Sequence, residues 1–367
     1  MADEPPMEPR ASVKNLIPYI PGKPIEELER ELGIRGAAKM ASNENPLGPS
    51  PLAKEALSEH VSKVNLYPDG CCFELRRKLS EKLGVPEDTI VIGNGSNEVI
   101  EIVARTFLEP GDEAIYGRHA FIVYPIVTQS LGCSHVVSRM PDLTHDLEDM
   151  LSLVTEKTKI IYIANPNNPT GTIVRRDEFE WFLERVPENV LILVDEAYFE
   201  YVDDPEYPDT LRYHSVRESL VTVRTFSKIY GLAGLRVGYG VASKEAVSYM
   251  DRVREPFNVN SAAQAAACAA LDDDRHVARS RKLNRTAKEY LREKLGELGV
   301  RYTESHTNFL LVDLERDPMP VYEALLRDGV ITRPVGGYGL KTHLRVSFGL
   351  DSENEKFIES LGRILRR

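Results

Sequence analysis

The residues from Val223 to Arg236, V-R-T-F-S-K-I-Y-G-L-A-G-L-R, carry the strongest signal in the sequence for the fold and for a ligand site. An apolar strand is expected to end at Thr225, and Lys228 follows it at a place that little water reaches. A desolvated lysine with cations nearby has a lowered pKa and can form an imine with an aldehyde. Thr225, Ser227 and Arg236 offer hydroxyls and a guanidinium, which suit a phosphate dianion. The stretch therefore predicts a lysine that binds a phosphorylated aldehyde; a surface lysine after a strand, with hydroxyls that cap a turn, is the alternative.

Strands and helices alternate on both sides of this stretch, which predicts an α/β fold with a mostly parallel central sheet flanked by helices. Residues 159–164 and 190–194 are continuous apolar runs, typical of fully buried strands. We expect a large domain at residues 51–255, a smaller α+β domain at 256–367, and an N-terminal arm at 1–50 that forms part of the small domain. The cleft between the domains is the expected ligand site. Further strands are expected at residues 90–92, 113–116, 219–225 and 236–241, and helices at 51–64, from 73 to 84 and from 261 to 299.

The composition argues against several classes of function. The formal net charge is −11, whereas nucleic-acid and anionic-membrane partners need a basic surface. No apolar run approaches the ~18–20 residues of a membrane span, and residues 1–10 are acidic and proline-rich, unlike a signal peptide. The four cysteines lack CxxC spacing and the eight histidines lack HxxxH spacing, so we expect reduced thiols and no metal site. The sequence thus predicts a cytoplasmic protein whose partners are small molecules rather than nucleic acid or membrane.

Asp195 follows the apolar run at 190–194, so its carboxylate is expected at the carboxyl edge of a buried strand, where open α/β sheets bind ligands. A buried carboxylate is costly unless it is paired. A protonated pyridine nitrogen would pair it, and the pair would keep the ring cationic as an electron sink. A helix N-cap is the alternative role. Tyr198, three residues on, could reach the same ligand from the following turn.

Two polar loops follow other strands. The turn at 165–171, N-P-N-N-P-T-G, leaves its asparagine amides free because the prolines deny it a helix, although a rigid turn is the simpler interpretation. The segment at 93–98, G-N-G-S-N-E, lies between a strand and a helix, so its amides could hold a phosphate at the helix N-terminus. Glu98 stands where a dinucleotide fingerprint has its third glycine, which argues against a dinucleotide-dependent oxidoreductase.

The chain resembles the fold-type I, class I/II aminotransferases that depend on pyridoxal 5'-phosphate (PLP), in residue type, order and spacing over nearly its whole length. The resemblance rests on N-P-T-G at 168–171, D-E-A-Y at 195–198, and S-K at 227–228 followed by Gly231 and Arg236. It implies that Lys228 holds PLP as a Schiff base (aldimine) and that Asp195 pairs the pyridine nitrogen. It also implies that Asn168 and Tyr198 bond the ring hydroxyl. The implied phosphate site consists of Ser96, Asn97, Thr225, Ser227 and Arg236.

An aromatic residue stacks on the cofactor ring in that family, after the strand that is here expected to end at Tyr116. Phe121 fits the spacing to Gly132 and would replace the more usual tyrosine or tryptophan. Tyr124, three residues later, is the other candidate, and the sequence leaves the choice open.

Three N-terminal segments resemble the histidinol-phosphate aminotransferases within this class. They are P-Y-I-P-G-K-P at 18–24, S-N-E-N-P-L-G at 42–48 and L-Y-P-D at 66–69. The resemblance implies a substrate-side role for Tyr19. It also implies a homodimer with shared active sites, in which Tyr67 reaches the phosphate of the neighbouring subunit's cofactor. A packing role for Tyr19 and a simple turn at Tyr67 are the alternatives.

Arginines are expected to hold the anionic groups of the substrate. In H-L-R-V-S-F at 343–348, strand alternation places the apolar residues on one face and Arg345 on the other. The resemblance implies that Arg345 grips a substrate carboxylate or phosphate. Arg333, before a proline in a similar strand, is a second candidate, with a surface position as its alternative.

The implied reaction is a ping-pong transamination of histidine biosynthesis. Histidinol phosphate and 2-oxoglutarate would give imidazole acetol phosphate and glutamate, and Lys228 would move the proton. An aromatic-amino-acid aminotransferase, or a PLP lyase or decarboxylase on the same fold, would share the cofactor residues. A PLP-binding regulator would need a DNA-binding region, and the acidic leader is too short for one.

Overall fold

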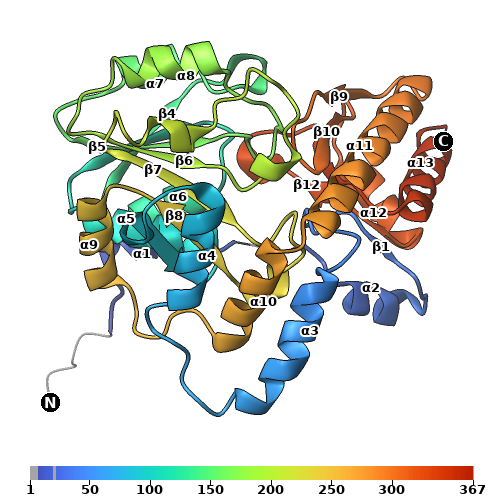
Figure 1. The fold of residues 1–367 in the computed structure, drawn as a ribbon. Helices are drawn as coiled ribbons and strands as arrows, with labels where there is room; N and C mark the ends of the chain where they lie inside the picture. The colour runs from blue at the N-terminus through green and yellow to red at the C-terminus, as the bar shows by residue number, and fades with distance from the viewer. Residues whose placement is uncertain (1–6, 20–21, 367) are drawn as a thin grey trace, which may run out of the picture.

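The computed structural model describes residues 7–19 and 22–366, so the predictions for residues 1–6, Ile20 and Pro21 lie outside the described residues. The chain forms a larger and a smaller lobe that lie side by side (Figure 1). The larger lobe surrounds a seven-stranded sheet, and the smaller lobe contains a four-stranded sheet.

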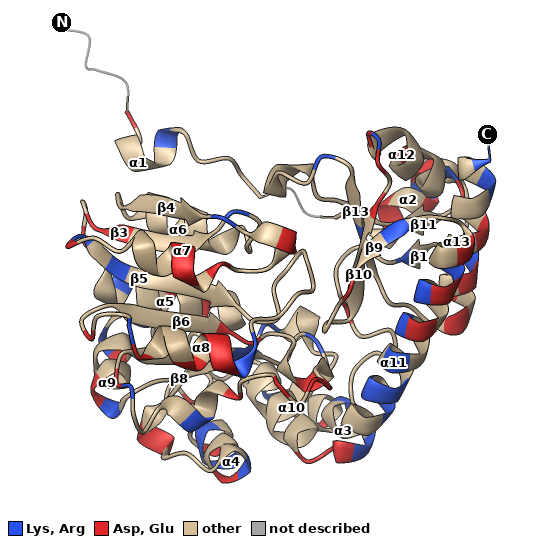
Figure 2. Ribbon diagram, turned by 90° about the horizontal axis from the view of Figure 1, so that it is seen from above, with Lys and Arg blue, Asp and Glu red and all other residues tan. Residues whose placement is uncertain are grey.

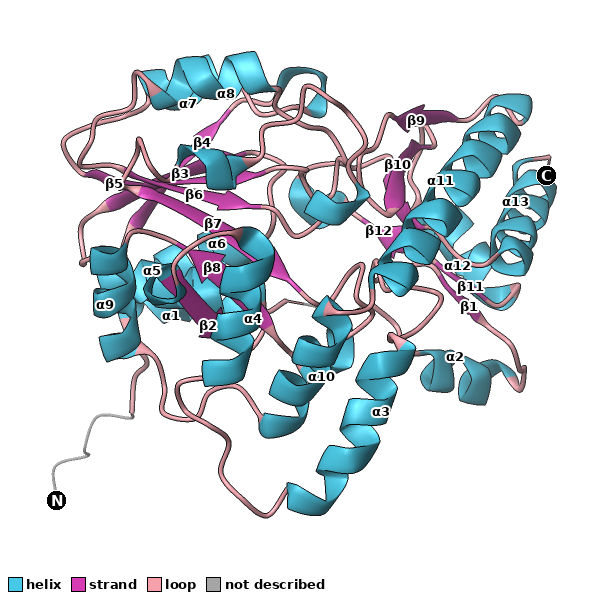
Figure 3. Cartoon of the chain, viewed as in Figure 1, coloured by secondary structure: helices cyan, strands magenta, loops and turns pink. Residues whose placement is uncertain are grey.

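The large sheet confirms the predicted mostly parallel α/β architecture. Its order is β2-β8-β7-β6-β5-β3-β4, and only β8 runs antiparallel to its neighbours. In sheet order the bounds are β2 (Ile90–Gly93), β8 (Gly238–Val241), β7 (Leu220–Thr225), β6 (Leu191–Asp195), β5 (Thr158–Ala164), β3 (Glu113–Gly117) and β4 (Ser134–Ser138). The strands predicted from apolar runs therefore exist, and they lie together in the middle of the larger lobe (Figure 3).

Helices cover both faces of this sheet, which explains why β6 is apolar at every position from Leu191 to Val194. In β6, Leu193 packs into the cluster formed with α5, whereas Ile192 and Val194 pack into the cluster formed with α7 and α8. One face carries α5 (Ser96–Phe107), α6 (Val123–Ser130) and α9 (Lys244–Val253), and the other carries α7 (Leu147–Ser152) and α8 (Arg176–Leu183).

A further apolar cluster joins α3 (Pro51–His60), α4 (Phe73–Leu83) and α10 (Ser261–Leu271) to the edge of the sheet. Two predicted signals for helix ends are confirmed, one at the start of α3 and one at the end of α4. Ser50 caps α3 by accepting from the Ala53 N–H at 3.3 Å, and Gly84 ends α4 in a left-handed conformation with φ 68°. Although α10 lies beyond residue 255, it packs against α3 and α4. The domain limits stay a prediction.

The smaller lobe is an antiparallel sheet covered by helices. The sheet order is β12 (Arg333–Pro334), β13 (His343–Ser347), β10 (Phe309–Asp313) and β9 (Arg301–Thr303), and the helices are α11 (Asp274–Glu297), α12 (Met319–Arg327) and α13 (Asp351–Leu365). The N-terminal segment contains α1 (Ala11–Lys14), α2 (Ile25–Leu32) and β1 (Ala38–Lys39). Because β1 pairs in parallel with β11 (Val330–Ile331), residues 38–39 join this lobe, whereas α1 contacts α6 of the larger lobe.

Charged side chains lie mainly on the outer helices. Figure 2 shows them along α4, α11 and α13, whereas the strands of the large sheet carry few. Within the described residues, no helix is both long enough and apolar enough to span a membrane.

Candidate active site

A cavity of about 270 Å³ lies where β5, β6 and β7 end, and it is closed on its far side by residues of the smaller lobe. Ala164, Asp195 and Thr225, the last residues of the three strands, all line it. Parallel strands bring their carboxyl ends to one edge of a sheet, which is why segments far apart in sequence meet here. Of the predicted site residues, the cavity wall contains Tyr19, Ser96, Asn97, Phe121, Asn168, Asp195, Tyr198, Thr225, Ser227, Lys228, Arg236 and Arg345.

Lys228 has the environment of a lysine that can react with an aldehyde. Its burial lowers its pKa to about 8, and the guanidinium of Arg345 acts in the same direction. The Nζ atom donates to the Ser42 carbonyl at 3.4 Å and lies 5.7 Å from the centroid of the Tyr198 ring. A lysine with this pKa is partly neutral near pH 7–8, as a nucleophilic amine must be.

Asp195 is a buried carboxylate whose oxygens accept only neutral donors. Oδ2 accepts from the Tyr124 hydroxyl at 3.0 Å, and Oδ1 accepts from the Ala197 N–H at 3.1 Å. Burial raises the pKa of Asp195 to about 6. A cationic ring nitrogen fits this position, because pairing would offset the cost of burying the charge.

The opposite end of the cavity suits a phosphate group. The helix α5 begins there at Ser96, so its free N–H groups and helix dipole face the cavity. Gly95 has φ 85°, and a Cβ there would lie 2.3 Å from an Arg236 nitrogen, so glycine is needed for the guanidinium to approach. The Ser227 hydroxyl accepts from Arg236 at 3.3 Å and from Thr225 at 3.0 Å. The donors needed for a phosphate dianion are therefore gathered at one point.

Polar side chains from both lobes meet between these two ends. The Tyr198 hydroxyl accepts from Asn43 Nδ2 at 2.9 Å, so its own proton is available to a ligand. Arg345 donates to Asn168 Oδ1 and to the Ala41 carbonyl, each at 2.6 Å. Its Nε atom is buried without a hydrogen-bond partner in the described part of the chain. The guanidinium is therefore held in place with hydrogen-bonding capacity unused.

Phe121 and Tyr124, the two candidates for the stacking residue, have different surroundings. Phe121 lines the cavity, whereas Tyr124 lies behind it, fully buried. The Tyr124 ring stacks on Tyr162 at 4.8 Å between centroids, with 5° between the planes. This geometry favours Phe121 as the residue that contacts a cofactor ring.

Asn43, Glu44 and Tyr338 line the cavity but were not predicted as site residues. Asn43 was within reach of sequence reasoning, because it lies in the S-N-E-N-P-L-G segment. It is held by Ser347, whose hydroxyl accepts from the Asn43 N–H and donates to Asn43 Oδ1, both at 2.8 Å across 304 positions of sequence. Tyr338 follows two glycines, a signal for a loop but not for a ligand. Its carbonyl lies 2.6 Å from His119 Nδ1 of the larger lobe.

Two predicted residues lie outside the cavity wall. The side chain of Tyr67 is 84% exposed and stacks on Phe257 at 4.9 Å between ring centroids. The guanidinium of Arg333 lies 5.4 Å from the centroid of the Tyr19 ring, which does line the cavity. In the single chain, Arg333 therefore lies beside the cavity, against the ring of Tyr19, and Tyr67 faces the solvent.

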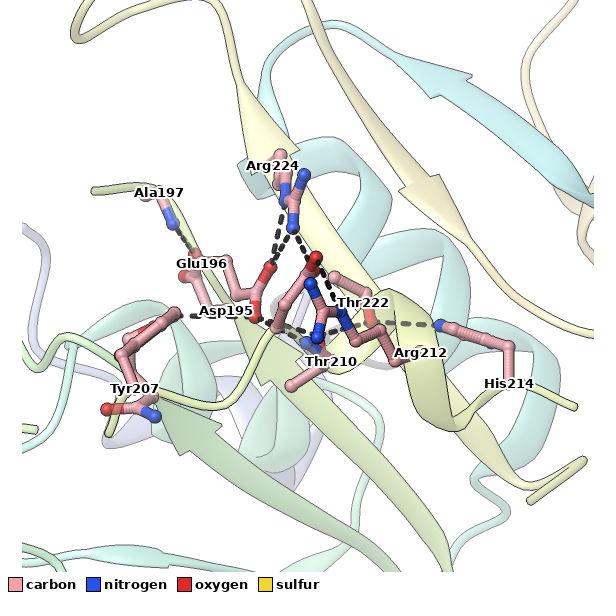
Figure 4. A network of polar contacts seen from close by, with 11 residues as sticks. Asp195, Glu196, Ala197, Tyr207, Thr210, Arg212, His214, Thr222 and Arg224 are labelled. Carbon is pink, nitrogen blue, oxygen red and sulfur yellow. Dashed lines mark hydrogen bonds and ion pairs between the residues drawn. The ribbon is translucent and has the colours of Figure 1, made fainter. Parts of the chain in front are cut away.

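A buried polar network supports the strand ends that carry the site (Figure 4). Glu196 and Arg224 form an ion pair at 2.7 Å, and both side chains are almost fully buried. Thr210 donates to Glu196 at 2.8 Å, and Asp209 pairs with Arg224 at 3.1 Å. Since Glu196 follows the end of β6 and Arg224 lies in β7, the pair joins the strands that position Asp195 and the hydroxyl of Thr225.

No group of three or more metal-binding side chains occurs in the residues that the structure describes. The fold and the cavity instead define a class of protein, the PLP-dependent aminotransferases of fold type I. The comparison with known families agrees, because the model of the family "Aminotransferase class I and II" matches residues 36–361. The chain belongs to the class I and II aminotransferases.

Within this family the chain is similar to histidinol-phosphate aminotransferases over almost its full length. It is 51% identical over 355 residues to histidinol-phosphate aminotransferase 2 of Pseudomonas aeruginosa, with 96% of each chain covered. It is 45% identical to histidinol-phosphate aminotransferase of Caldicellulosiruptor saccharolyticus, covering 97% of this chain and 99% of the relative. The structure of histidinol-phosphate aminotransferase from Sinorhizobium meliloti in complex with pyridoxal-5'-phosphate matches with a TM-score of 0.89 at 26% identity, covering 97% of each chain.

Proposed function

We propose that the protein is a PLP-dependent transaminase that moves the amino group of L-histidinol phosphate to 2-oxoglutarate. The observation that carries the proposal is the position of Lys228 in one cavity with Asp195 and Arg345. The histidinol-phosphate aminotransferases that resemble the chain at 45–51% identity support this choice of substrate.

Bound PLP would supply the electron sink that stabilises negative charge on the substrate carbon. Asp195 would pair its ring nitrogen, and Asn168 and Tyr198 would hold its ring hydroxyl. Its phosphate would lie at the start of α5, against Ser96, Asn97, Thr225, Ser227 and Arg236. Phe121 would cover the face of the ring.

Lys228 would first anchor the cofactor and then act as the general base and acid. Its pKa of about 8 allows the freed Nζ atom to take a proton from the substrate carbon near neutral pH and to return it. Tyr198 would keep the ring hydroxyl in place through its own O–H, because Asn43 already donates to the Tyr198 oxygen. Tyr198 and Asn43 are buried and Lys228 is half-buried, which limits the water that would compete for the proton.

Arg345 would receive the anionic end of each substrate, the phosphate of histidinol phosphate in one half-reaction and a carboxylate of 2-oxoglutarate in the other. Tyr19 would form the wall beside the substrate, and Arg333 would act through its contact with the Tyr19 ring at 5.4 Å. A guanidinium can bind either anion through paired N–H groups.

Single-turnover absorbance measurements test the substrate assignment. The holoenzyme is mixed separately with L-histidinol phosphate, L-histidinol, L-histidine and L-phenylalanine, and conversion of the cofactor is followed. L-Histidinol is the matched control, because it lacks only the phosphate. We expect histidinol phosphate to react fastest per unit concentration. A faster reaction with phenylalanine would replace the proposal by an aromatic-amino-acid aminotransferase.

We also propose a homodimer in which Tyr67 serves the partner's active site. Tyr67 stacks on the exposed Phe257, and residues 61–73 around it in sequence carry further exposed apolar side chains; large patches of this kind mark interfaces. The further side chains are Val61, Val64, Leu66 and Phe73. Sedimentation at micromolar concentration tests the assembly, and a monomer would refute it.

The cytoplasm is the proposed location. All four cysteines are free, including the buried Cys72 and Cys133. Unpaired cysteines are typical of a reducing compartment. Localisation of a tagged chain by cell fractionation tests this, and a periplasmic or secreted pool would contradict it.

A further inference from the structure

We propose that Tyr124 is a positioning residue that acts through Asp195: its hydroxyl keeps this carboxylate charged and aimed at the ring nitrogen of the cofactor. The inference rests on the proposed role of Asp195. The proposed role of Tyr124 differs from stacking on the cofactor ring, for which the sequence left Phe121 and Tyr124 as alternatives.

The geometry leaves the Tyr124 hydroxyl little freedom. Tyr124 belongs to α6 and is fully buried, with its ring flat on Tyr162 of β5 at 4.8 Å. Phe121 meets the ring edge-on at 6.0 Å between centroids. The hydroxyl lies 3.0 Å from Asp195 Oδ2, on an oxygen for which no second hydrogen-bond donor is found among the described residues.

The electrostatics show what this bond does. Burial raises the pKa of Asp195 to about 6, while the Tyr124 hydroxyl, the Ala197 N–H and the charge of Lys228 act against the rise. Glu196, the next residue, adds to it. Burial and the neighbouring carboxylate hold the pKa of Tyr124 well above its ordinary value, so the phenol remains a protonated donor. A hydrogen bond donated to a carboxylate favours the charged form of that carboxylate.

The consequence concerns one proton. Asp195 would hold the ring nitrogen of PLP and would compete with it for one proton. The hydrogen bond from the Tyr124 hydroxyl lowers the basicity of the carboxylate, so it would favour the proton on the nitrogen and the positive charge on the ring. Removal of the phenol would shift this balance toward the carboxylate oxygen and would weaken the electron sink that PLP supplies. Tyr124 therefore supports the electron sink without touching the cofactor.

The test compares Tyr124→Phe with Tyr162→Phe in the holoenzyme. Each change removes one hydroxyl from the same stacked pair and keeps both rings. The Tyr162 hydroxyl is buried, and its polar neighbour is the Thr128 hydroxyl rather than Asp195, which makes it the matched control. The readouts are the pH at which the visible absorption band of the bound cofactor titrates, and the apparent affinity for PLP.

We expect Tyr124→Phe to move the band titration to higher pH, because a neutral ring draws fewer electrons from the nitrogen that joins the cofactor to Lys228. We expect its affinity for PLP to fall about tenfold, the scale of a hydrogen bond to a charged group. Tyr162→Phe should leave both readouts as in the parent protein. Equal shifts in the two variants, or none in Tyr124→Phe, would overturn the inference.

A double substitution separates an action through Asp195 from a general effect on packing. Once Asp195→Asn is present, Tyr124→Phe should cause no further shift of the band, and an additive shift would refute the coupling. If Tyr124→Phe does not fold, 3-fluorotyrosine at position 124 strengthens the donor and should move the band titration to lower pH. A shift to higher pH would refute the idea. Failure of the parent protein to bind PLP would instead refute the proposed function.

Discussion

Replacing Asp195 by asparagine should stabilise the protein when PLP has been removed. The folded-state pKa of about 6 lies above the ordinary value of 3.8 because the carboxylate is buried. The folded chain therefore binds this proton more tightly than the unfolded chain does. The stabilisation that the folded protein gains from binding this proton is fully present below about pH 4, and it is lost as the pH rises through about 6.

The magnitude follows from the same shift. The rise in the pKa of Asp195 from 3.8 to about 6, at about 1.36 kcal/mol per pKa unit, corresponds to about 3 kcal/mol of unfolding free energy that is lost between acid and neutral pH. Asparagine carries no charge and escapes this loss. The difference in free energy of unfolding between Asp195→Asn and the parent protein should thus be small near pH 4 and reach about 2–3 kcal/mol above about pH 7.

Urea denaturation of the cofactor-free proteins across this pH range measures the difference. Asp203→Asn is the matched control, because Asp203 is exposed at the surface and should give the same pH profile as the parent protein. Saturating PLP should then reverse the order, stabilising the parent protein far more than Asp195→Asn. A stability difference that does not change with pH would refute the electrostatic reasoning.

Four further predictions concern the cofactor anchor, the substrate, the buried Glu196–Arg224 ion pair and the assembly of the site. Borohydride should trap the cofactor on Lys228, and peptide mapping that finds the adduct on another lysine would exclude this anchor. Arg345→Ala should lower kcat/KM by about 30-fold or more in both half-reactions, the effect of removing about 2 kcal/mol; a loss in only one would show that the other anion binds elsewhere. Glu196→Gln should lower the free energy of unfolding by about 3 kcal/mol in urea titrations, because it leaves Arg224 buried without its closest partner; an unchanged midpoint would contradict that. Mixing inactive Lys228→Ala with an inactive Tyr67→Ala should restore activity in hybrid dimers, and absence of recovery would argue against shared sites.

The cofactor side of the cavity could be predicted from sequence because its signals are local. Asp195 follows a continuous apolar run, and Thr225 and Lys228 lie at and just after the end of a second predicted strand; parallel strands deliver such positions to one edge of a sheet. The alternation in β13 likewise predicted that Arg345 would face away from the apolar core.

The remaining contacts depend on tertiary distances that no local pattern contains. In the sequence, Tyr124 has the pattern of an apolar helix residue. Its hydrogen bond to Asp195 spans 71 positions. Asn43 reaches Tyr198 across 155 positions from a backbone with positive φ. The contact of His119 with the Tyr338 carbonyl spans 219 positions and joins the lobes. Such pairs are fixed by how distant elements pack against one another, so no local pattern in the sequence reveals them.

The contact between Asn43 and Ser347 has a consequence for synthesis on the ribosome. Residues 96–236, which supply most of the cofactor side, emerge well before the last strands, whereas Asn43 must wait for Ser347, 304 positions later. Translation proceeds at about 5–20 residues per second, so the early segment waits many seconds for its partner. The wall of the cavity that Asn43 and Arg345 form is therefore completed only after Ser347 has been made, long after the residues on the opposite wall.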